Sequence, residues 1–503
     1  MWLAHIIRRG LERDPDALAL RDVRRDVSWR QLHRDTAALA ARLRRSAPRG
    51  SRVLVLSGNR VEVLETYLAC AVAGLVAVPV NPALTDRELG DIVEAVEPVA
   101  AVAEGEQLVR LDGLYPMLVL TDVATVAALP DAAEPVAEGA GTLADPVMIL
   151  HTSATTGAAK GVVVDQRSLQ LNALSWLADV RPDADTAFLN AGPLFHGSVV
   201  IALDHLAAGG TVCVLDRFTP QGCLAALERW RIGHAFLVPS MVRLLLDAKG
   251  LDGTDLAALR LLLHGAAPMP ADLAREAAGR LGVRLQTVFG ITEGGGPVVS
   301  LAPGTPVGEP PVPGAVCVGR PMLGTALKVA DSAGAPVPAG TVGELHVAGA
   351  GLMQGYWKKP EATAEVLRDG WLNTHDLGCV GDDGLVWVVD RRNDLVLRGG
   401  QNVYPAEVEH VLRQSPLVAD VVVVPVASEV WGQTPVAFVV PAAGAEFDED
   451  GLLALCIGQL AAYKRPSHFL RVDAIPRNPA GKALRPRLRE LAHRTINEPE
   501  DPR

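Results

Sequence analysis

The sequence predicts an α/β fold with a large N-terminal domain and a small α+β C-terminal domain. The chain has 503 residues and 49% apolar residues, which is too long for a single core. Between residues 52 and 288, strand-like runs alternate with helix-like stretches, as in βα units on a mainly parallel sheet. A charged stretch then precedes a C-terminal section with its own helices and strands. We expect an N-terminal domain at 1–391, a hinge at 392–394 and a mobile domain at 395–503.

The first βα units justify this prediction. Residues 52–56 form an apolar run, residues 61–73 have helical periodicity, and residues 76–80 are apolar and β-branched. Helix 86–96 and strand 99–102 continue the alternation. Further strands are expected at 147–150, 211–215, 235–238, 259–264 and 284–288.

The pattern changes after residue 300. Residues 303–313 are rich in Pro and Gly and predict a loop. A β-rich section follows from 316 to about 389, with alternation at 343–347 and 385–389. The C-terminal section predicts helices at 406–413 and 451–461 and strands at 418–425 and 435–440.

Composition excludes several classes of function. The net charge of −11 and the lack of a long basic run argue against nucleic-acid binding. The longest apolar run, near residues 67–80, is too short to cross a bilayer, and we expect no membrane insertion. The N-terminus has no sustained apolar signal region, and the six cysteines form no C-x-x-C pair. We therefore expect a cytoplasmic protein with reduced thiols.

The segment at residues 151–161, HTSATTGAAKG, is the most informative motif. It holds four hydroxyls, two glycines and one lysine, directly after an apolar strand. Small and hydroxylated residues let backbone N–H groups surround an anion, and a lysine adds a positive charge. It is not a Walker A loop, because Gly161 follows Lys160 where Ser or Thr is required. The motif predicts a phosphate-binding loop, with an ordinary polar loop as the alternative.

This segment resembles the Thr-Ser-Gly-Thr-Thr-Gly-x-Pro-Lys-Gly loop of the adenylate-forming (ANL) superfamily, which includes acyl-CoA synthetases, aryl-CoA ligases, peptide-synthetase adenylation domains and luciferases. Ala154 and Ala159 replace its glycine and proline. Further segments resemble the family in the same order, so the resemblance covers essentially the whole chain. These segments are 286–293, 370–378, 390–391 with 399–405, and 476–482.

The resemblance implies an AMP-forming acid–thiol ligase. Such an enzyme activates a carboxylic acid with ATP to acyl-AMP, releases pyrophosphate, and transfers the acyl group to CoA. Lys482 would bridge the carboxylate and the α-phosphate, and Thr292 would contact the α-phosphate. Glu293 would hold Mg²⁺, a hard cation that takes oxygen ligands.

The resemblance also implies a nucleotide site. Phe289, where the family usually has tyrosine, would lie against the adenine, Asp376 would accept the ribose hydroxyls, and Arg391 would reach the same ribose. The hydroxyls and Lys160 of the loop would hold the β- and γ-phosphates. The residues implied for ATP or AMP are Thr152, Ser153, Thr155, Thr156, Gly157, Lys160, Gly265, Ala266, Phe289, Gly290, Asp376 and Arg391.

The implied acyl pocket favours a bulky aromatic or alicyclic acid. Peptide-synthetase domains have an aspartate just after the phenylalanine matching Phe195, but this chain has His196, which argues against an amino acid. His264 is interpreted equally well as a pocket residue or as a core histidine. A medium- or long-chain fatty acid remains an alternative substrate. The implied pocket residues are His196, Gly197, Pro239, Ser240, His264, Ile291, Gly294, Gly295 and Gly296.

The acceptor is expected to be CoA. The residues implied for CoA and its pantetheine arm are Gly399, Gly400, Trp431, Tyr463 and Arg465, with core packing or a solvated charge as the alternative roles of Trp431 and Arg465. The hinge would lie at Asn393.

Other functions remain open from the sequence. Because no Gly-Gly-x-Ser motif follows residue 482, the thiol would come from CoA or from a separate acyl carrier protein. An acyl-AMP ligase that loads such a carrier is therefore the first rival. A non-catalytic nucleotide-binding protein and a luciferase-like oxygenase are the others, and a homodimer is left open.

Overall fold

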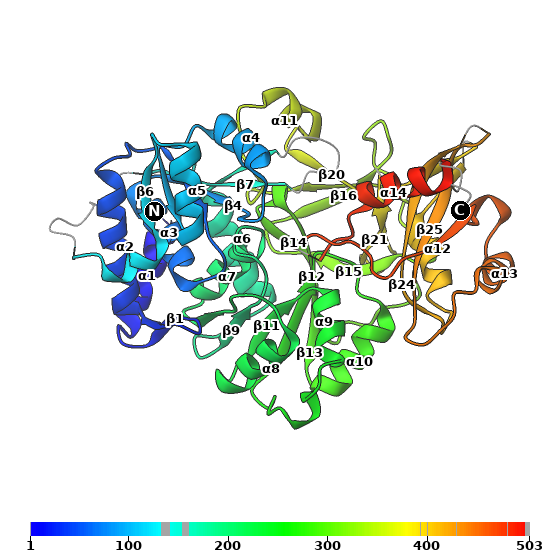
Figure 1. Cartoon of the computed structure of the whole chain (residues 1–503), viewed down its shortest axis with the longest axis horizontal. Helices are drawn as coiled ribbons and strands as arrows, with labels where there is room; N and C mark the ends of the chain where they lie inside the picture. The colour runs from blue at the N-terminus through cyan, green and yellow to red at the C-terminus, as the bar shows by residue number, and fades with distance from the viewer. Residues whose placement is uncertain are drawn as a thin grey trace, which may run out of the picture.

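A computed structural model describes residues 2–131, 141–152, 160–392, 394–399, 401–428, 430–479 and 481–497. Two large sheets and their helices make up the N-terminal part, and a smaller sheet makes up the C-terminal part, at the right of Figure 1. The mixed α/β architecture confirms the predicted fold class. The predicted hinge residue Asn393 lies outside the described residues.

One sheet of the N-terminal part has seven strands, and its central strands are parallel. The antiparallel strand that follows the predicted phosphate loop lies near one edge. In spatial order the strands are β18 (Gly355–Tyr356), β8 (Gly161–Asp165), β7 (Pro146–His151), β4 (Val76–Val80), β3 (Arg52–Leu56), β5 (Ala100–Ala103) and β6 (Val119–Asp122).

The second sheet has fourteen strands and combines the remaining parallel βα units with the predicted β-rich section. The strands from β9 to β13 run parallel, and β13 turns antiparallel to β14. In spatial order they are β16 (Ala326–Ala330), β17 (Gly343–Ala348), β20 (Trp371–Val380), β21 (Val386–Arg391), β15 (Val316–Pro321), β14 (Gly296–Leu301), β13 (Arg284–Ile291), β12 (Leu261–Gly265), β11 (His234–Leu237), β9 (Ala187–Asn190), β10 (Thr211–Val214), β1 (Leu18–Arg21) and β2 (Asp26–Ser28), with β19 (Leu367–Arg368) beside β20.

The C-terminal sheet has five strands: β23 (Gln401–Val403), β22 (Val396–Arg398), β25 (Gly432–Pro441), β24 (Val418–Ser428) and, beside β25, β26 (His468–Arg471). The helices of the described chain are α1 (Trp2–Arg13), α2 (Trp29–Arg44), α3 (Val61–Ala73), α4 (Asp86–Val96), α5 (Gly105–Leu114), α6 (Gln166–Asp179), α7 (Ser198–Ala207), α8 (Pro220–Arg229), α9 (Pro239–Leu246), α10 (Ala271–Leu281), α11 (Pro360–Val366), α12 (Pro405–Leu412), α13 (Glu449–Gln459) and α14 (Arg485–Asn497). None of them, within the described ranges, has the length and apolarity that crossing a bilayer requires.

The local signals explain why the first elements form where the sequence predicts them. Strand β3, helix α3 and strand β4 have the predicted bounds. Helix α3 ends at Gly74, whose φ of 68° is the left-handed conformation that glycine adopts easily. Helix α4 begins with a capping box between Thr85 and Glu88.

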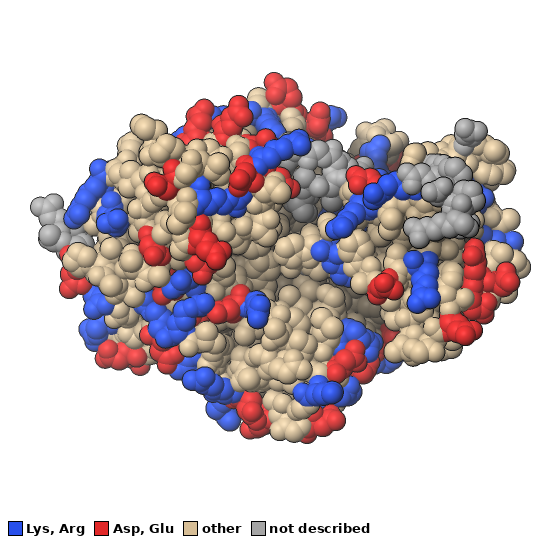
Figure 2. All heavy atoms as spheres, in the orientation of Figure 1, with Lys and Arg blue, Asp and Glu red and all other residues tan. Residues whose placement is uncertain are grey.

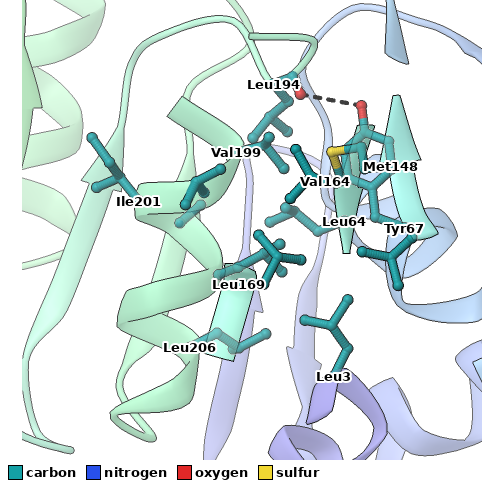
Figure 3. Close-up of a cluster of buried hydrophobic side chains, with 14 of the residues drawn as sticks. Leu3, Leu64, Tyr67, Met148, Val164, Leu169, Leu194, Val199, Ile201 and Leu206 are labelled. Atoms are coloured by element: carbon teal, nitrogen blue, oxygen red, sulfur yellow. Dashed lines mark hydrogen bonds between the residues drawn. The ribbon is translucent and has the colours of Figure 1, made fainter. Parts of the chain in front are cut away.

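The main core positions the loop that carries His196. Figure 3 shows apolar side chains from α3, the β7–β8 hairpin, α6 and α7 meeting in one buried cluster. The Tyr67 hydroxyl donates to the Leu194 carbonyl at 3.1 Å within that cluster. Because a buried polar group must keep its partner, this bond fixes the backbone just before His196.

Candidate functional site

The two ends of the predicted phosphate loop are joined where β7 pairs with β8. The Thr152 N–H donates to the Lys160 carbonyl at 3.0 Å, and the Thr152 hydroxyl accepts from the Lys160 N–H at 3.3 Å. The ammonium of Lys160 lies 4.8 Å from the centre of the Tyr356 ring. The predicted phosphate contacts Ser153, Thr155, Thr156 and Gly157, like Ala154 and Ala159, lie outside the described residues.

Glu293, the predicted Mg²⁺ ligand, lies in the short 3₁₀ turn η3 (Thr292–Gly294) that follows β13, next to Thr292, the predicted α-phosphate contact. Its carboxylate accepts a hydrogen bond from the Tyr356 hydroxyl at 2.7 Å. Burial and the Glu293 charge both raise the pKa of Tyr356, so the phenol keeps its proton. Sequence reasoning missed Tyr356, although the aromatic pair after Gly355 was an available signal.

Asp376 and Arg391 are direct neighbours across β20 and β21. The Arg391 Nε donates to Asp376 Oδ1 at 3.0 Å, whereas Oδ2 of the same buried carboxylate has no hydrogen-bond partner in the described part of the chain. Burial raises the pKa of Asp376, and the charges of Arg391 and Lys482 oppose that rise. A buried acceptor without a donor suits a ligand hydroxyl.

Lys482 comes from the C-terminal part but reaches the same place. Its loop closes on Asn478, whose side chain accepts from the Lys482 N–H at 2.9 Å and whose own N–H donates to the Lys482 carbonyl at 2.8 Å. A Cβ on Gly481 would lie 2.8 Å from Val238 and 3.1 Å from the Ser240 hydroxyl, so the loop contacts the N-terminal part directly. Figure 1 shows the segment before α14 reaching into the middle of the molecule, near β12 and β14.

The electrostatics of Lys482 identify its neighbours. Burial and the Arg391 charge lower the pKa of Lys482 to about 8, while the charges of Asp376 and Glu293 act in the opposite direction. The structure therefore brings two cations and two carboxylates together from η3, β20, β21 and the C-terminal loop. Such a cluster can hold an anionic group on the cations while the carboxylates take hydroxyls or a metal ion.

Three of the predicted acyl-pocket residues lie beside this cluster or its C-terminal loop. His196 precedes α7, and burial together with the nearby Lys482 charge lowers its pKa. Pro239 and Ser240 begin α9, against which Gly481 rests. An uncharged imidazole, a proline ring and a hydroxyl offer no carboxylate to an ammonium group.

His264 has features of both roles that the sequence left open. Its Nε2 lies 3.1 Å from the Thr287 hydroxyl, as expected for a core histidine. Its buried Nδ1 has no partner in the described chain, and burial lowers its pKa to about 4. The side chain is therefore neutral at physiological pH.

The glycines near Ile291 fit close backbone packing. A Cβ on Gly295, whose φ is 70°, would lie 2.5 Å from the Gly351 carbonyl, and one on Gly296 would lie 3.0 Å from the Asn172 carboxamide. A Cβ on Gly290 would lie 2.7 Å from the Gly296 carbonyl, and one on Gly294 would lie 2.9 Å from Val298. The space beside these four glycines is therefore filled by other atoms of the chain. A Cβ on Gly197, in contrast, would meet no atom within 4 Å.

The predicted CoA residues gather around Arg398, which sequence reasoning missed. The Arg398 guanidinium lies 5.7 Å from the Trp431 ring and donates to the carbonyls of Tyr463 and Arg465 at 3.3 and 2.9 Å. The Gly399 N–H donates to the Trp431 carbonyl at 2.8 Å. The Arg465 guanidinium donates to carbonyls near the end of α13, so some of its N–H donors stabilise the fold and are not available to a ligand. Gly400 lies outside the described residues.

Charged side chains of both signs lie on the surface. Figure 2 shows basic and acidic side chains mixed over the face it draws, without a continuous basic stripe. Nucleic-acid binding proteins gather lysine and arginine on one face. The six cysteines are all free and buried.

Comparisons with known proteins cover almost the whole chain. Residues 7–357 match the AMP-binding enzyme family, and residues 407–482 match the AMP-binding enzyme C-terminal domain. Feruloyl-CoA synthase of an Amycolatopsis species is 36% identical over 496 residues, with 96% of this chain and 97% of that protein covered. The fatty acid–[acyl-carrier-protein] ligase ScoC of Streptomyces coeruleorubidus is 34% identical, with 93% and 92% covered.

Two further comparisons are informative. Indoleacetate–CoA ligase of Aromatoleum aromaticum is 31% identical, with 98% of this chain and 99% of that protein covered. The crystal structure of ATP-bound MatB from Rhodopseudomonas palustris superposes with a TM-score of 0.90 at 30% identity, with 98% of this chain and all of that chain covered.

Proposed function

The chain belongs to the family of AMP-binding enzymes, and we propose that it joins a carboxylic acid to CoA through an acyl-AMP intermediate. The single observation that carries this proposal is the position of Lys482 beside Glu293, Asp376 and Arg391. A lysine delivered from the C-terminal part supplies positive charge where a carboxylate and a phosphate must meet.

In the first step, a carboxylate oxygen attacks the α-phosphorus of ATP, and the bond to the pyrophosphate oxygen breaks. Both reacting groups are anionic, so the transition state gains most from fixed cations. Lys482 would bridge the two groups, and Thr292 would donate to the α-phosphate. Lys160 and the preceding loop would hold the departing pyrophosphate.

The nucleotide would be held by a carboxylate oxygen that has no hydrogen-bond partner and by an aromatic ring. The unpartnered Oδ2 of Asp376 would accept a ribose hydroxyl, and Arg391 holds the other oxygen in place. Phe289 lies at the end of β13 and is partly buried, so its ring would offer a face to the adenine.

Mg²⁺ would be bound by a single carboxylate of the chain, that of Glu293. No cluster of three or more His, Cys, Asp or Glu side chains suited to a metal occurs among the described residues. Mg²⁺ is commonly held by one or two carboxylates together with substrate phosphates, and Glu293 would be that carboxylate. The ion would neutralise triphosphate charge.

We propose a bulky aromatic or alicyclic acid as the substrate. Feruloyl-CoA synthase and indoleacetate–CoA ligase, at 36% and 31% identity, carry names of aromatic acids. His196 offers no carboxylate that would bind the ammonium of an amino acid. The free, buried cysteines support a cytoplasmic location.

The second candidate function is the loading of an acyl carrier protein. The observation that favours it is the 34% identity to ScoC. In either case a thiolate attacks the acyl carbonyl of the adenylate, and AMP leaves. The residues around Arg398 would receive the pantetheine arm of CoA or of the carrier.

The test is pyrophosphate release from ATP and Mg²⁺ across a panel of aromatic, alicyclic, fatty and amino acids, with and without CoA. We expect release with an aromatic or alicyclic acid, together with an acyl-CoA mass when CoA is added. Release without an acyl-CoA product would favour the carrier protein. An absence of release with every acid would contradict the proposal.

A further inference from the structure

We propose that Tyr356 is a positioning residue that keeps two opposite charges of the ATP site apart: the carboxylate of Glu293 and the ammonium of Lys160. The inference rests on the proposed function, since it assigns these two groups to Mg²⁺ and to the phosphates. It adds a third residue that touches both of them.

The backbone places Tyr356 beside the end of the phosphate loop. Strand β18 pairs with β8, and Tyr356 faces Val162, two residues after Lys160. The Trp357 N–H donates to the Gly161 carbonyl at 2.7 Å, and the Gln354 N–H donates to the Val163 carbonyl at 3.0 Å. The short strand therefore holds Tyr356 at a fixed distance from the lysine.

The same segment also holds Glu293 at two points. The Met353 N–H donates to the Glu293 carbonyl at 2.9 Å, and the Tyr356 hydroxyl donates to its carboxylate at 2.7 Å. Within the described part of the chain, this phenol is the only hydrogen-bond donor to that carboxylate. One oxygen is thereby oriented, and the other stays available to a metal ion.

The Tyr356 ring contacts the ammonium of Lys160. The Lys160 ammonium lies 4.8 Å from the ring centre, within the range of a cation–π contact. The phenol end and the ring face of one side chain thus bind a carboxylate and an ammonium separately. In the described residues, Lys160 and Glu293 form no direct ion pair.

This separation matters because the two charges would otherwise neutralise each other. A lysine paired with Glu293 would be withdrawn from the phosphates, and the carboxylate would be withdrawn from the metal ion. Tyr356 is buried at 7% exposure and the two charged side chains are partly buried, so a direct pair between Lys160 and Glu293 would be stronger here than in bulk water.

Two substitutions separate the two contacts. Tyr356→Phe removes the hydroxyl and keeps the ring, so we expect the Mg²⁺ concentration for half-maximal pyrophosphate release to rise about 10-fold, as for the loss of a group that orients a metal ligand. Its affinity for metal-free ATP, measured by calorimetry, should stay unchanged. Tyr356→Leu removes both contacts, and it should also weaken metal-free ATP binding by about 2- to 5-fold.

Tyr115→Phe provides a matched control, because it removes a hydroxyl at the end of α5 without touching Glu293 or Lys160. Thermal unfolding of each variant accompanies the assays. The inference is overturned if Tyr356→Phe leaves the Mg²⁺ dependence unchanged, or if both Tyr356 variants weaken metal-free ATP binding equally. A wild-type protein that binds no ATP would instead overturn the proposed function and, with it, this inference.

Discussion

The buried carboxylate of Asp390 accepts a hydrogen bond from the backbone N–H of Ala406 at 3.0 Å. Asp390 lies in β21, and Ala406 lies in the first turn of α12, where helix N–H groups favour a negative charge. Tyr404 packs against the apolar cluster beside β21. The contact therefore joins the fourteen-stranded sheet to the first helix of the C-terminal part.

Replacement of Asp390 by asparagine should change the pH dependence of stability. Burial raises the pKa of Asp390 to about 7 from 3.8, despite the nearby Arg485, and the Glu409 charge adds to the rise. Because the folded protein binds this proton more tightly than the unfolded chain does, proton binding stabilises the fold at low pH, and this stabilisation is lost as the pH rises from 3.8 to about 7. We expect the Tm of the wild type to fall relative to that of Asp390→Asn between pH 5 and pH 7. A constant Tm difference over this range would contradict the assignment.

Removal of the Lys482 ammonium should impair one half-reaction. Lys482→Ala is expected to slow acyl-AMP formation by about 10²-fold or more, the scale for losing one transition-state contact. Thioester formation from pre-made acyl-AMP should survive, because that step no longer requires the bridge to the α-phosphate. Pyrophosphate release and acyl-CoA formation are measured separately. Equal loss in both steps would exclude the proposed role.

The pH dependence of acyl-AMP formation gives an independent test of the role of Lys482. Because the pKa of Lys482 is lowered to about 8, the ammonium is lost as the pH rises through that value. Acyl-AMP formation should decline there. Lys482→Arg keeps a cation that stays charged throughout this range, so its activity, although lower, should not decline there. An identical decline in that variant would assign the titration to another group.

Gly481 should be required for delivery of Lys482. Its φ is 78°, and a Cβ would lie 2.8 Å from Val238, so Gly481→Ala is expected to displace the loop and to slow acyl-AMP formation about 10-fold or more. Gly444→Ala is the matched control, because Gly444 also has a φ of 78° and a Cβ there meets no atom within 4 Å. If both variants slow the step equally, backbone strain rather than contact with Val238 is responsible.

The sequence predicted most of the elements because apolar periodicity is a local property. The bounds of β3, α3 and β4 follow from alternation and from Gly74 at the helix end. The roles of Glu293 and Lys482 came from resemblance to a family, since each alone is an ordinary surface residue type. The contact between Tyr356 and Glu293 could not be predicted, because Glu293 lies 63 residues earlier in the sequence and only the fold brings the two side chains together.

Two neighbouring residues at the end of β12 should respond in opposite ways. A Cβ on Gly265 would lie 2.2 Å from the Val288 carbonyl, so Gly265→Ala must open the β12–β13 pairing, lower the Tm and weaken ATP binding. Ala266 has a φ of 65°, which costs an alanine about 1–2 kcal/mol. Ala266→Gly relieves that strain but frees the unfolded chain, which costs about 0.5–1 kcal/mol. Urea unfolding should therefore show a net change from zero to about +1.5 kcal/mol. A loss of stability in Ala266→Gly would mean that the methyl group makes a contact that outweighs the strain.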